Sequence, residues 1–240
     1  MSLASFARPV WRVVTRPVGT VRAVATAEPH VVVTYDDGPD PVATPLVLEQ
    51  LRQHGATATF FVLMTRARRY PEMIREILAE GHEIGLHGVD HTRLTTLPVR
   101  EVHRRTRDGK SELEDLAGRP VRWFRAPYGA LLPAHWTAVR RTGLMPVAWG
   151  PTPSDWVELP EEELAAEAMR GCAAGEILLA HDGMAGPDDG VPDDGPAPAI
   201  DRGKLADLML TGLADRGLQG RSLHDSLRHG RARRWAWFIR

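Results

Sequence analysis

The chain has 240 residues, of which 43% are hydrophobic and 25% charged, with 30 Lys and Arg side chains against 31 Asp and Glu. This length and composition suffice for a sizeable buried core and exclude a largely disordered chain. The formal net charge of -1 argues against nucleic-acid binding through overall basicity, and the single cysteine, Cys172, excludes a disulfide framework.

Residues 1–30 are predicted to form a basic N-terminal arm. Its apolar runs are interrupted by prolines and by four arginines, Arg8, Arg12, Arg16 and Arg22. A secretory signal needs an uninterrupted apolar stretch, and a transmembrane helix needs a longer one still. The sequence shows neither, so we expect a cytoplasmic protein.

Strand and helix patterns alternate about seven times after this arm. Strands are predicted over residues 31–35, 58–63, 83–86, 121–124, 144–149, 176–180 and 218–222. Helices are predicted over residues 41–54, 71–80, 98–117, 133–142, 160–170 and 200–216. This alternation predicts an α/β fold with a parallel sheet. We expect a closed or nearly closed β/α barrel, with a doubly wound open sheet as the alternative.

The first predicted strand ends in two adjacent carboxylates, Asp36 and Asp37. They repel each other unless a cation lies beside them. Successive side chains of an extended chain point in opposite directions, so one could face a metal and the other a substrate. The alternative is a turn, Asp-Gly-Pro, that only caps the following helix.

Two histidines follow the third predicted strand. His87 and His91 are four residues apart, a spacing that would place both imidazoles on one face of a helical turn. Such pairs also occur by chance on polar helices. Two His and one Asp would leave positions open for water and substrate, as in catalytic zinc sites. The remaining histidines are expected at the surface, among them His54, His103, His135, His224 and His229.

Later strand ends supply further candidates, at the face where barrel enzymes carry their chemistry. Arg125 would place a fixed cation there or would form a structural ion pair. Asp155 and Trp156 follow the fifth strand. His181 ends the sixth strand and is a candidate general acid, because imidazole titrates near neutrality.

Together these residues resemble the five motifs of the polysaccharide deacetylase family, carbohydrate esterase family four. The motifs occur in order over roughly residues 31–182 and are Asp36-Asp37-Gly38-Pro39, His87-x-x-x-His91, Arg125-x-Pro127-Tyr128-Gly129, Asp155-Trp156 and Leu179-x-His181-Asp182. The resemblance implies a distorted β/α barrel with about seven strands. It also implies a hydrolase that removes an acyl group, most often N-acetyl, from an amino-sugar substrate.

The resemblance assigns a metal centre to the first two motifs. Asp37, His87 and His91 would hold a divalent metal, most often zinc, with cobalt or nickel as alternatives. Asp36 would take a proton from water as the catalytic base. Arg125 would pair with that base.

The remaining motifs would supply the acid and the substrate contacts. Asp155 would orient His181, which would protonate the leaving amine. The backbone N–H of Tyr128 would help to hold the oxyanion, and Trp156 and Leu179 would line a pocket for the acetyl methyl group. No nucleic acid is expected as a partner.

The chain departs from the family pattern at four positions. Gly88 stands where Ser or Thr usually follows the first metal histidine, and Thr152 stands where an Asp is often found. Ala126 replaces a common Pro, and Tyr35 replaces the usual Phe. None of these changes removes a ligand, the base or the acid, but they leave the substrate preference open. O-acetyl ester or small-amide hydrolysis and a catalytically silent sugar-binding barrel remain as alternatives.

Three regions lie outside the motifs. Residues 183–198 are rich in Gly, Pro and Asp and predict a long surface loop beside the site. The catalytic barrel would span residues 31–225, and residues 226–240 would form a basic and aromatic tail. That tail either packs its aromatics under the fold or, with the N-terminal arm, contacts an anionic membrane surface.

Overall fold

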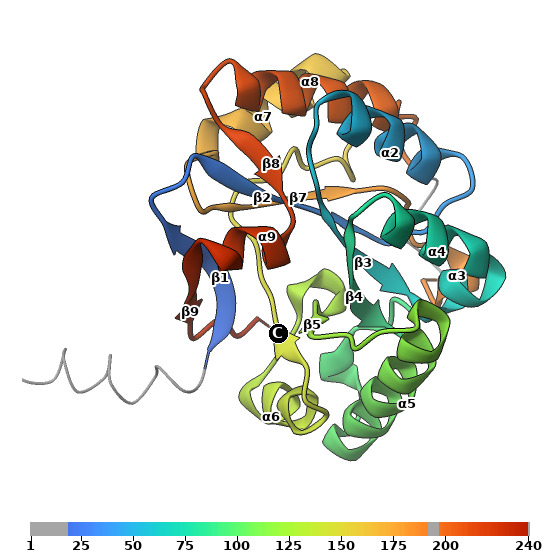
Figure 1. The fold of residues 1–240 in the computed structure, drawn as a ribbon. Helices are drawn as coiled ribbons and strands as arrows, with labels where there is room; N and C mark the ends of the chain where they lie inside the picture. The colour runs from blue at the N-terminus through green and yellow to red at the C-terminus, as the bar shows by residue number, and fades with distance from the viewer. Residues whose placement is uncertain (1–18, 192–196, 240) are drawn as a thin grey trace, which may run out of the picture.

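The computed structural model describes residues 19–191 and 197–239 (Figure 1). A parallel sheet of seven strands lies at its centre, in the order β6-β5-β4-β3-β2-β7, with β8 paired to β2. The predicted α/β fold with a parallel sheet is therefore confirmed. The strands are β2 (His30–Asp36), β3 (Thr59–Leu63), β4 (Glu83–Gly88), β5 (Trp123–Phe124), β6 (Met145–Pro146), β7 (Ile177–His181) and β8 (Gln219–Arg221).

The ladder of paired strands does not close between β6 and β7 in the described part of the chain. The segment after β6 bridges them instead. The Gly150 N–H donates to the Ile177 carbonyl at 2.7 Å, and the Leu179 N–H donates to the Pro151 carbonyl at 3.0 Å. Because β6 and β7 stand at opposite ends of the strand order, these bonds require the sheet to curl into a distorted barrel.

Helices surround the sheet on its outer side (Figure 1). They are α2 (Ala43–Gln53), α3 (Met64–Arg69), α4 (Pro71–Ala79), α5 (Val99–Ala117), α6 (Pro133–Arg141), α7 (Glu161–Gly171), α8 (Arg202–Ala214) and α9 (Leu223–Arg228). The short helices α3 and α9 were not predicted, because neither is long enough to show a helical period. The described part of the chain also contains three short 3₁₀ helices, η1 (Leu94–Thr96), η2 (Pro127–Gly129) and η3 (Pro187–Asp189).

The side chains of β2 alternate between two cores. Val31 and Val33 pack in the larger core under the helices, whereas Val32 packs with Phe61 and Ile177 in a second core. This alternation follows from the two-residue period of a strand. Both faces are apolar, as expected for a parallel sheet covered on both sides.

A second, two-stranded sheet was not predicted. It pairs β1 (Thr20–Thr26) with β9 (Gly230–Trp235) in antiparallel orientation, with Thr26 opposite Gly230. Strand β1 lies within the predicted N-terminal arm. Its Arg22 forms an ion pair with Glu176 at 2.8 Å. Arg8, Arg12 and Arg16 lie outside the described residues, and the boundaries of arm, barrel and tail stay a prediction.

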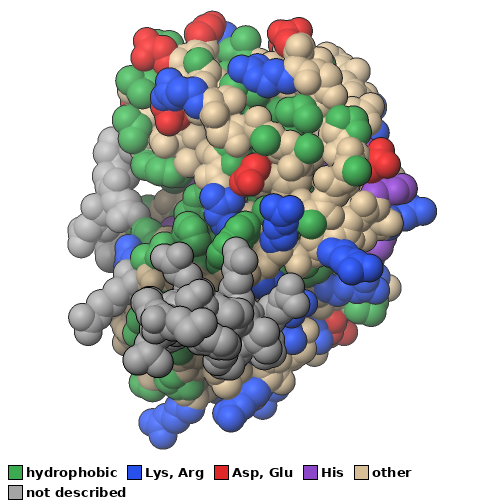
Figure 2. All heavy atoms as spheres, turned by 90° about the vertical axis from the view of Figure 1, so that its left-hand side faces the viewer, with side chains coloured by type: hydrophobic (Ala, Val, Ile, Leu, Met, Phe, Trp, Pro, Cys, Tyr) green, Lys and Arg blue, Asp and Glu red, His purple; other side chains and the backbone are tan. Residues whose placement is uncertain are grey.

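The C-terminal segment packs its aromatic side chains onto the barrel. Phe238 packs against the larger core, and the Trp237 ring lies 5.9 Å from the ring of Trp149. Lys and Arg side chains are spread over the whole face that carries β1 and β9, and the Asp and Glu side chains in view lie mostly in its upper part (Figure 2). Arg240 lies outside the described residues. In the ranges that the structure describes, no helix is both long and apolar enough to cross a membrane.

Candidate active site

A cavity of about 480 Å³ opens at the carboxyl ends of the barrel strands. All the predicted site residues except Arg125 and Asp155 line it. Those two are fully buried beneath it. The cavity lies where the chemistry of β/α barrels is found, because the loops that follow the strands meet at this end.

The three predicted metal ligands converge in this cavity. One donor atom from each of Asp37, His87 and His91 lies within 4.8 Å of the other two. The Asp37 Oδ1 atom is 3.2 Å from Nε2 of His87 and 3.4 Å from Nε2 of His91. This oxygen is buried and accepts no hydrogen bond among the described residues. A carboxylate oxygen and two imidazole nitrogens arranged in this way fit a divalent metal ion.

The charge states of these groups also fit a metal. Burial lowers the pKa of His91 to about 4, so its imidazole is neutral near pH 7, as a metal ligand must be. Burial alone would raise the pKa of Asp37. The neighbouring imidazoles, His87 first among them, outweigh this effect and hold that pKa well below its usual range, so the carboxylate is ionised.

The local backbone explains how the first two motifs reach the cavity. Asp37 has a positive φ of 71° at the turn that leaves β2. The His87 side chain is oriented by its Nδ1 atom, which lies 2.9 Å from the carbonyl oxygen of Arg125 and leaves Nε2 facing Asp37. Fixing one ring nitrogen on a carbonyl in this way is a common device for metal-binding histidines.

His91 does not lie in a helical turn, so that prediction is wrong. His87 lies near the end of β4, and His91 lies in the bend that follows. The chain turns at Gly88, whose φ is 132° and where a Cβ atom would come within 2.8 Å of the Asp90 carbonyl oxygen. Gly88, a departure from the family pattern, is thus required by this backbone.

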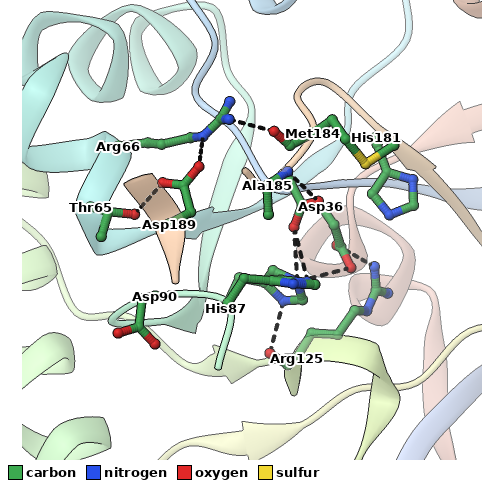
Figure 3. Close-up of polar contacts among 12 residues, drawn as sticks. Asp36, Thr65, Arg66, His87, Asp90, Arg125, His181, Met184, Ala185 and Asp189 are labelled. Atoms are coloured by element: carbon green, nitrogen blue, oxygen red, sulfur yellow. Dashed lines mark hydrogen bonds and ion pairs between the residues drawn. The ribbon is translucent and has the colours of Figure 1, made fainter. Parts of the chain in front are cut away.

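The predicted base lies beside the metal ligands. Asp36 accepts a hydrogen bond from Nη1 of Arg125 at 2.7 Å, and its Oδ2 atom is 3.9 Å from Nε2 of His87. Figure 3 shows Arg125 beside Asp36. Arg125 is buried, also donates to Thr34 at 2.8 Å and lies 4.2 Å from the Phe61 ring. Arg125 was predicted either to place a cation at the site or to form a structural ion pair. It does both, because its buried ion pair with Asp36 holds that carboxylate at the cavity.

The predicted acid lies at the end of β7. Nδ1 of His181 is 2.7 Å from Oδ1 of Asp155, and the His181 backbone N–H donates to Oδ2 of the same carboxylate at 2.9 Å. Burial alone would lower the pKa of His181, but the Asp155 carboxylate outweighs it and the pKa is raised to about 9. The imidazole is therefore protonated near pH 7 and can donate a proton.

Arg202 belongs to the group of side chains around the predicted acid and was not predicted from the sequence. Its Nη1 atom donates to Oδ2 of Asp155 at 2.7 Å and to the carbonyl oxygen of His181 at 2.8 Å. Arg202 is the first residue of α8 and is buried. A cation is disfavoured at the positive end of a helix dipole. An arginine at that position is thus the signal that could have found it.

The predicted substrate contacts surround the cavity. Tyr128 has a positive φ of 57°, and its ring lies 4.3 Å from that of His91. Leu179 is buried in the wall, and Trp156 is 48% exposed with its ring edge-on to His181 at 5.9 Å. The role of the Tyr128 N–H as an oxyanion donor stays a prediction.

Two of the remaining histidines, all expected at the surface, are buried: His82, just before β4, and His135. His135 is buried in α6, with Nε2 3.2 Å from the Leu97 carbonyl oxygen. The prediction failed because α6 packs against α5 and buries His135 beside Trp136, so the polar residue type was a poor guide to exposure.

The fold and the site together are those of a β/α barrel with a candidate metal site at the carboxyl ends of its strands. Comparison with known proteins identifies the family. The sequence profile described as polysaccharide deacetylase matches residues 23–147. A chitooligosaccharide deacetylase of Azorhizobium caulinodans is 38% identical over 167 residues, which cover 69% of this chain and 80% of that protein. The chain belongs to the polysaccharide deacetylase family, as the sequence motifs predicted.

Other proteins that are similar to this chain are also named deacetylases. A peptidoglycan-N-acetylglucosamine deacetylase of Bacillus cereus is 35% identical over 170 residues, covering 70% of this chain and 79% of that protein. The solved structure of the peptidoglycan deacetylase PdaC from Bacillus subtilis superposes with a TM-score of 0.70 at 28% identity, covering 84% of this chain and 91% of that one.

A further solved structure is similar to this chain in fold but only distantly in sequence. BA3943 from Bacillus anthracis, described as a pseudoenzyme of the CE4 family, has a TM-score of 0.75 at 21% identity and covers 89% of this chain and 70% of that one. Since the barrel occurs in a pseudoenzyme, the activity of this chain has to be argued from its side chains.

Proposed function

We propose that this chain is a metal-dependent hydrolase that removes an N-acetyl group from an amino-sugar substrate. The observation that carries the proposal is the convergence of Asp37, His87 and His91 in one cavity, which Asp36 and His181 also line. The names of its relatives, which are chitooligosaccharide and peptidoglycan deacetylases, support a carbohydrate substrate.

The metal is proposed to be zinc, with cobalt or nickel as alternatives, because a carboxylate and two imidazoles suit such ions. Bound at Asp37, His87 and His91, it would polarise the acyl carbonyl and acidify a water molecule. The ionised Asp37 and the neutral His91 support this assignment.

Two side chains around this centre would each carry out one proton transfer. Asp36 would accept the proton of the attacking water, and the ion pair with Arg125 holds its carboxylate in place. His181 would then protonate the departing nitrogen while Asp155 balances its charge. The Tyr128 N–H would donate to the oxyanion, which is worth roughly 3–4 kcal/mol in comparable sites.

The protonated His181 favours an amide over an ester as the substrate. An amine leaves far less readily than an alcohol unless it is protonated, so an acid held in this state matters most for amides. The complete set of ligands, base and acid argues against a silent sugar-binding barrel. O-acetyl ester and small-amide hydrolysis remain as the alternatives.

Acetate release tests the proposal. We expect the purified chain to release acetate from N-acetylglucosamine oligomers faster than from acetylated xylan, and to lose this activity with a chelator and regain it with added zinc. Acetate release from xylan alone would favour the ester alternative, and none from either substrate in the metal-loaded protein would favour the silent barrel.

Two further expectations belong with this proposal and stay predictions. One is a cytoplasmic location. The other is contact between the basic ends of the chain and an anionic membrane surface, for which the exposed Arg231, Arg233 and Arg234 of β9 are the relevant side chains. Binding to anionic vesicles that is unchanged when these arginines are replaced by Gln would contradict the second expectation.

A further inference from the structure

The loop that follows β7 contacts the metal ligands through its backbone. The Ala185 N–H donates to Oδ2 of Asp37 at 3.1 Å. The Asp189 carbonyl oxygen accepts a hydrogen bond of 2.7 Å from the His91 N–H. Residues 183–191 therefore touch two of the three ligand residues, and they do so by backbone groups that a side-chain substitution within the loop does not remove.

A single buried carboxylate holds this loop in place. Oδ1 of Asp189 accepts a hydrogen bond from the Thr65 hydroxyl at 2.6 Å, and Oδ2 accepts one from Nε of Arg66 at 3.0 Å. Oδ2 also accepts the Gly186 N–H at 3.2 Å. Figure 3 shows Asp189 between Thr65 and Arg66. Both oxygens are thus satisfied, as a buried charge requires.

Arg66 ties a second point of the loop to the same anchor. Its Nη2 atom donates to the Met184 carbonyl oxygen at 2.5 Å, one residue before Ala185. Arg66 and Thr65 belong to α3, which directly follows β3 and is thereby fixed to the sheet. Removing the Asp189 charge would leave the Arg66 guanidinium without its closest carboxylate.

We propose that Asp189 is a positioning residue for the metal centre, which holds residues 183–191 on Arg66 and Thr65 so that the loop backbone orients Asp37 and His91. The inference rests on the proposed function, because it assumes that these two residues bind a metal. Groups that orient ligands in this way commonly contribute about 10–100-fold to metal affinity.

The neighbouring Asp188 provides a matched control. It carries the same charge one residue earlier, but its side chain is 76% exposed and it reaches Arg69 at 3.3 Å on the surface. An effect of net charge would appear in both positions, whereas an effect of the anchor would appear at Asp189 alone.

The test is a titration of metal-free protein with zinc against a chromophoric chelator, for wild type, Asp189→Asn and Asp188→Asn. We expect zinc affinity to fall about 10-fold or more in Asp189→Asn and to stay unchanged in Asp188→Asn. Equal affinities of wild type and Asp189→Asn, or an equal fall in both variants, would overturn the inference.

Two further measurements distinguish a failure of the inference from a variant that does not fold and from a failure of the proposed function. If Asp189→Asn does not fold, the same titration of Arg66→Lys decides, with a fall expected and an unchanged affinity overturning the inference. A wild-type chain that binds zinc but releases no acetate would overturn the proposed function alone. A wild-type chain that binds none of zinc, cobalt and nickel would overturn both.

Discussion

Arg202 donates a hydrogen bond of 2.7 Å to the same carboxylate oxygen of Asp155 that accepts the backbone N–H of His181. Asp155 is fully buried, so its charge is balanced by these neighbours rather than by water. A buried carboxylate shared between two cations is held in one orientation. The group around the predicted acid is therefore a set of three side chains, His181, Asp155 and Arg202, rather than the pair that the motifs predict.

The first prediction concerns Arg202. Arg202→Met is expected to slow hydrolysis of an N-acetyl amide by about 10-fold or more, because a mispositioned acid loses part of its catalytic effect. Hydrolysis of 4-nitrophenyl acetate, whose leaving group needs no proton, should change less. The measurement is kcat on both substrates, with Arg216→Met just after the same helix as the control. An equal loss on both substrates would contradict a role in acid catalysis.

The second prediction concerns the base. Asp36→Asn is expected to lower kcat by about 10²–10⁴-fold, because the amide accepts no proton from water. Zinc content should be retained, since Asp36 is not a predicted ligand. Thermal unfolding should occur at a lower temperature, because Arg125 keeps a hydrogen-bond acceptor but loses its counter-charge. Near-normal activity in the zinc-loaded variant would exclude Asp36 as the base.

The third prediction concerns pH. The pKa of His181 is raised from 6.5 to about 9 in the metal-free protein, and a bound cation would lower it again. The alkaline limb of kcat for amide hydrolysis should therefore fall between these two values, as His181 loses its proton. In Asp155→Asn this limb should move to lower pH. A pH–rate profile measures both, and a profile without this limb would argue against His181 as the acid.

The raised pKa of His181 also predicts how the free energy of unfolding depends on pH. His181 has a higher pKa folded than unfolded, so its contribution is fully present below pH 6.5 and is lost as pH rises toward 9. The free energy of unfolding of the metal-free protein should decrease over this range. The decrease should be smaller in His181→Ala, and equal slopes in the two proteins would contradict the assignment.

The fourth prediction concerns the metal ligands. His87→Ala is expected to abolish zinc binding and activity, because one of three donors is lost. His103→Ala, on the outer helix α5, is the control and should keep both. Zinc content after purification and acetate release are the measurements. Full activity in a thoroughly metal-stripped wild-type sample would refute the metal assignment.

The fifth prediction concerns Gly88. Gly88→Ser restores the residue type usual in the family but is expected to lower the free energy of unfolding by about 1–3 kcal/mol. The reason is the φ of 132° and the contact with the Asp90 carbonyl oxygen. Gly186→Ala, where a Cβ atom meets nothing within 4 Å, is the control. Urea unfolding of both variants tests this, and equal stabilities would show that the bend at Gly88 relaxes.

Much of the fold could be predicted because its signals are local. Apolar runs and the Gly and Pro residues between them place most strands and helices within a few residues. The strands β5 and β6 are shorter than predicted, since backbone pairing with neighbours, not residue type, decides where a strand ends. The pairing of β1 with β9 joins opposite ends of the chain, and no local pattern reports such a contact.

By itself, the sequence determined which residues are candidates for the chemistry of the site. Asp36, Asp37, His87 and His91 are recognisable because they lie at or just after the ends of strands whose carboxyl ends meet at one end of a barrel. Only the tertiary structure decided which further side chains support them. Arg202 and Asp155 are 47 residues apart, and Arg66 and Asp189 are 123 residues apart. Contacts over such separations depend on how the elements pack, and the spacing of residues along the chain carries no record of them.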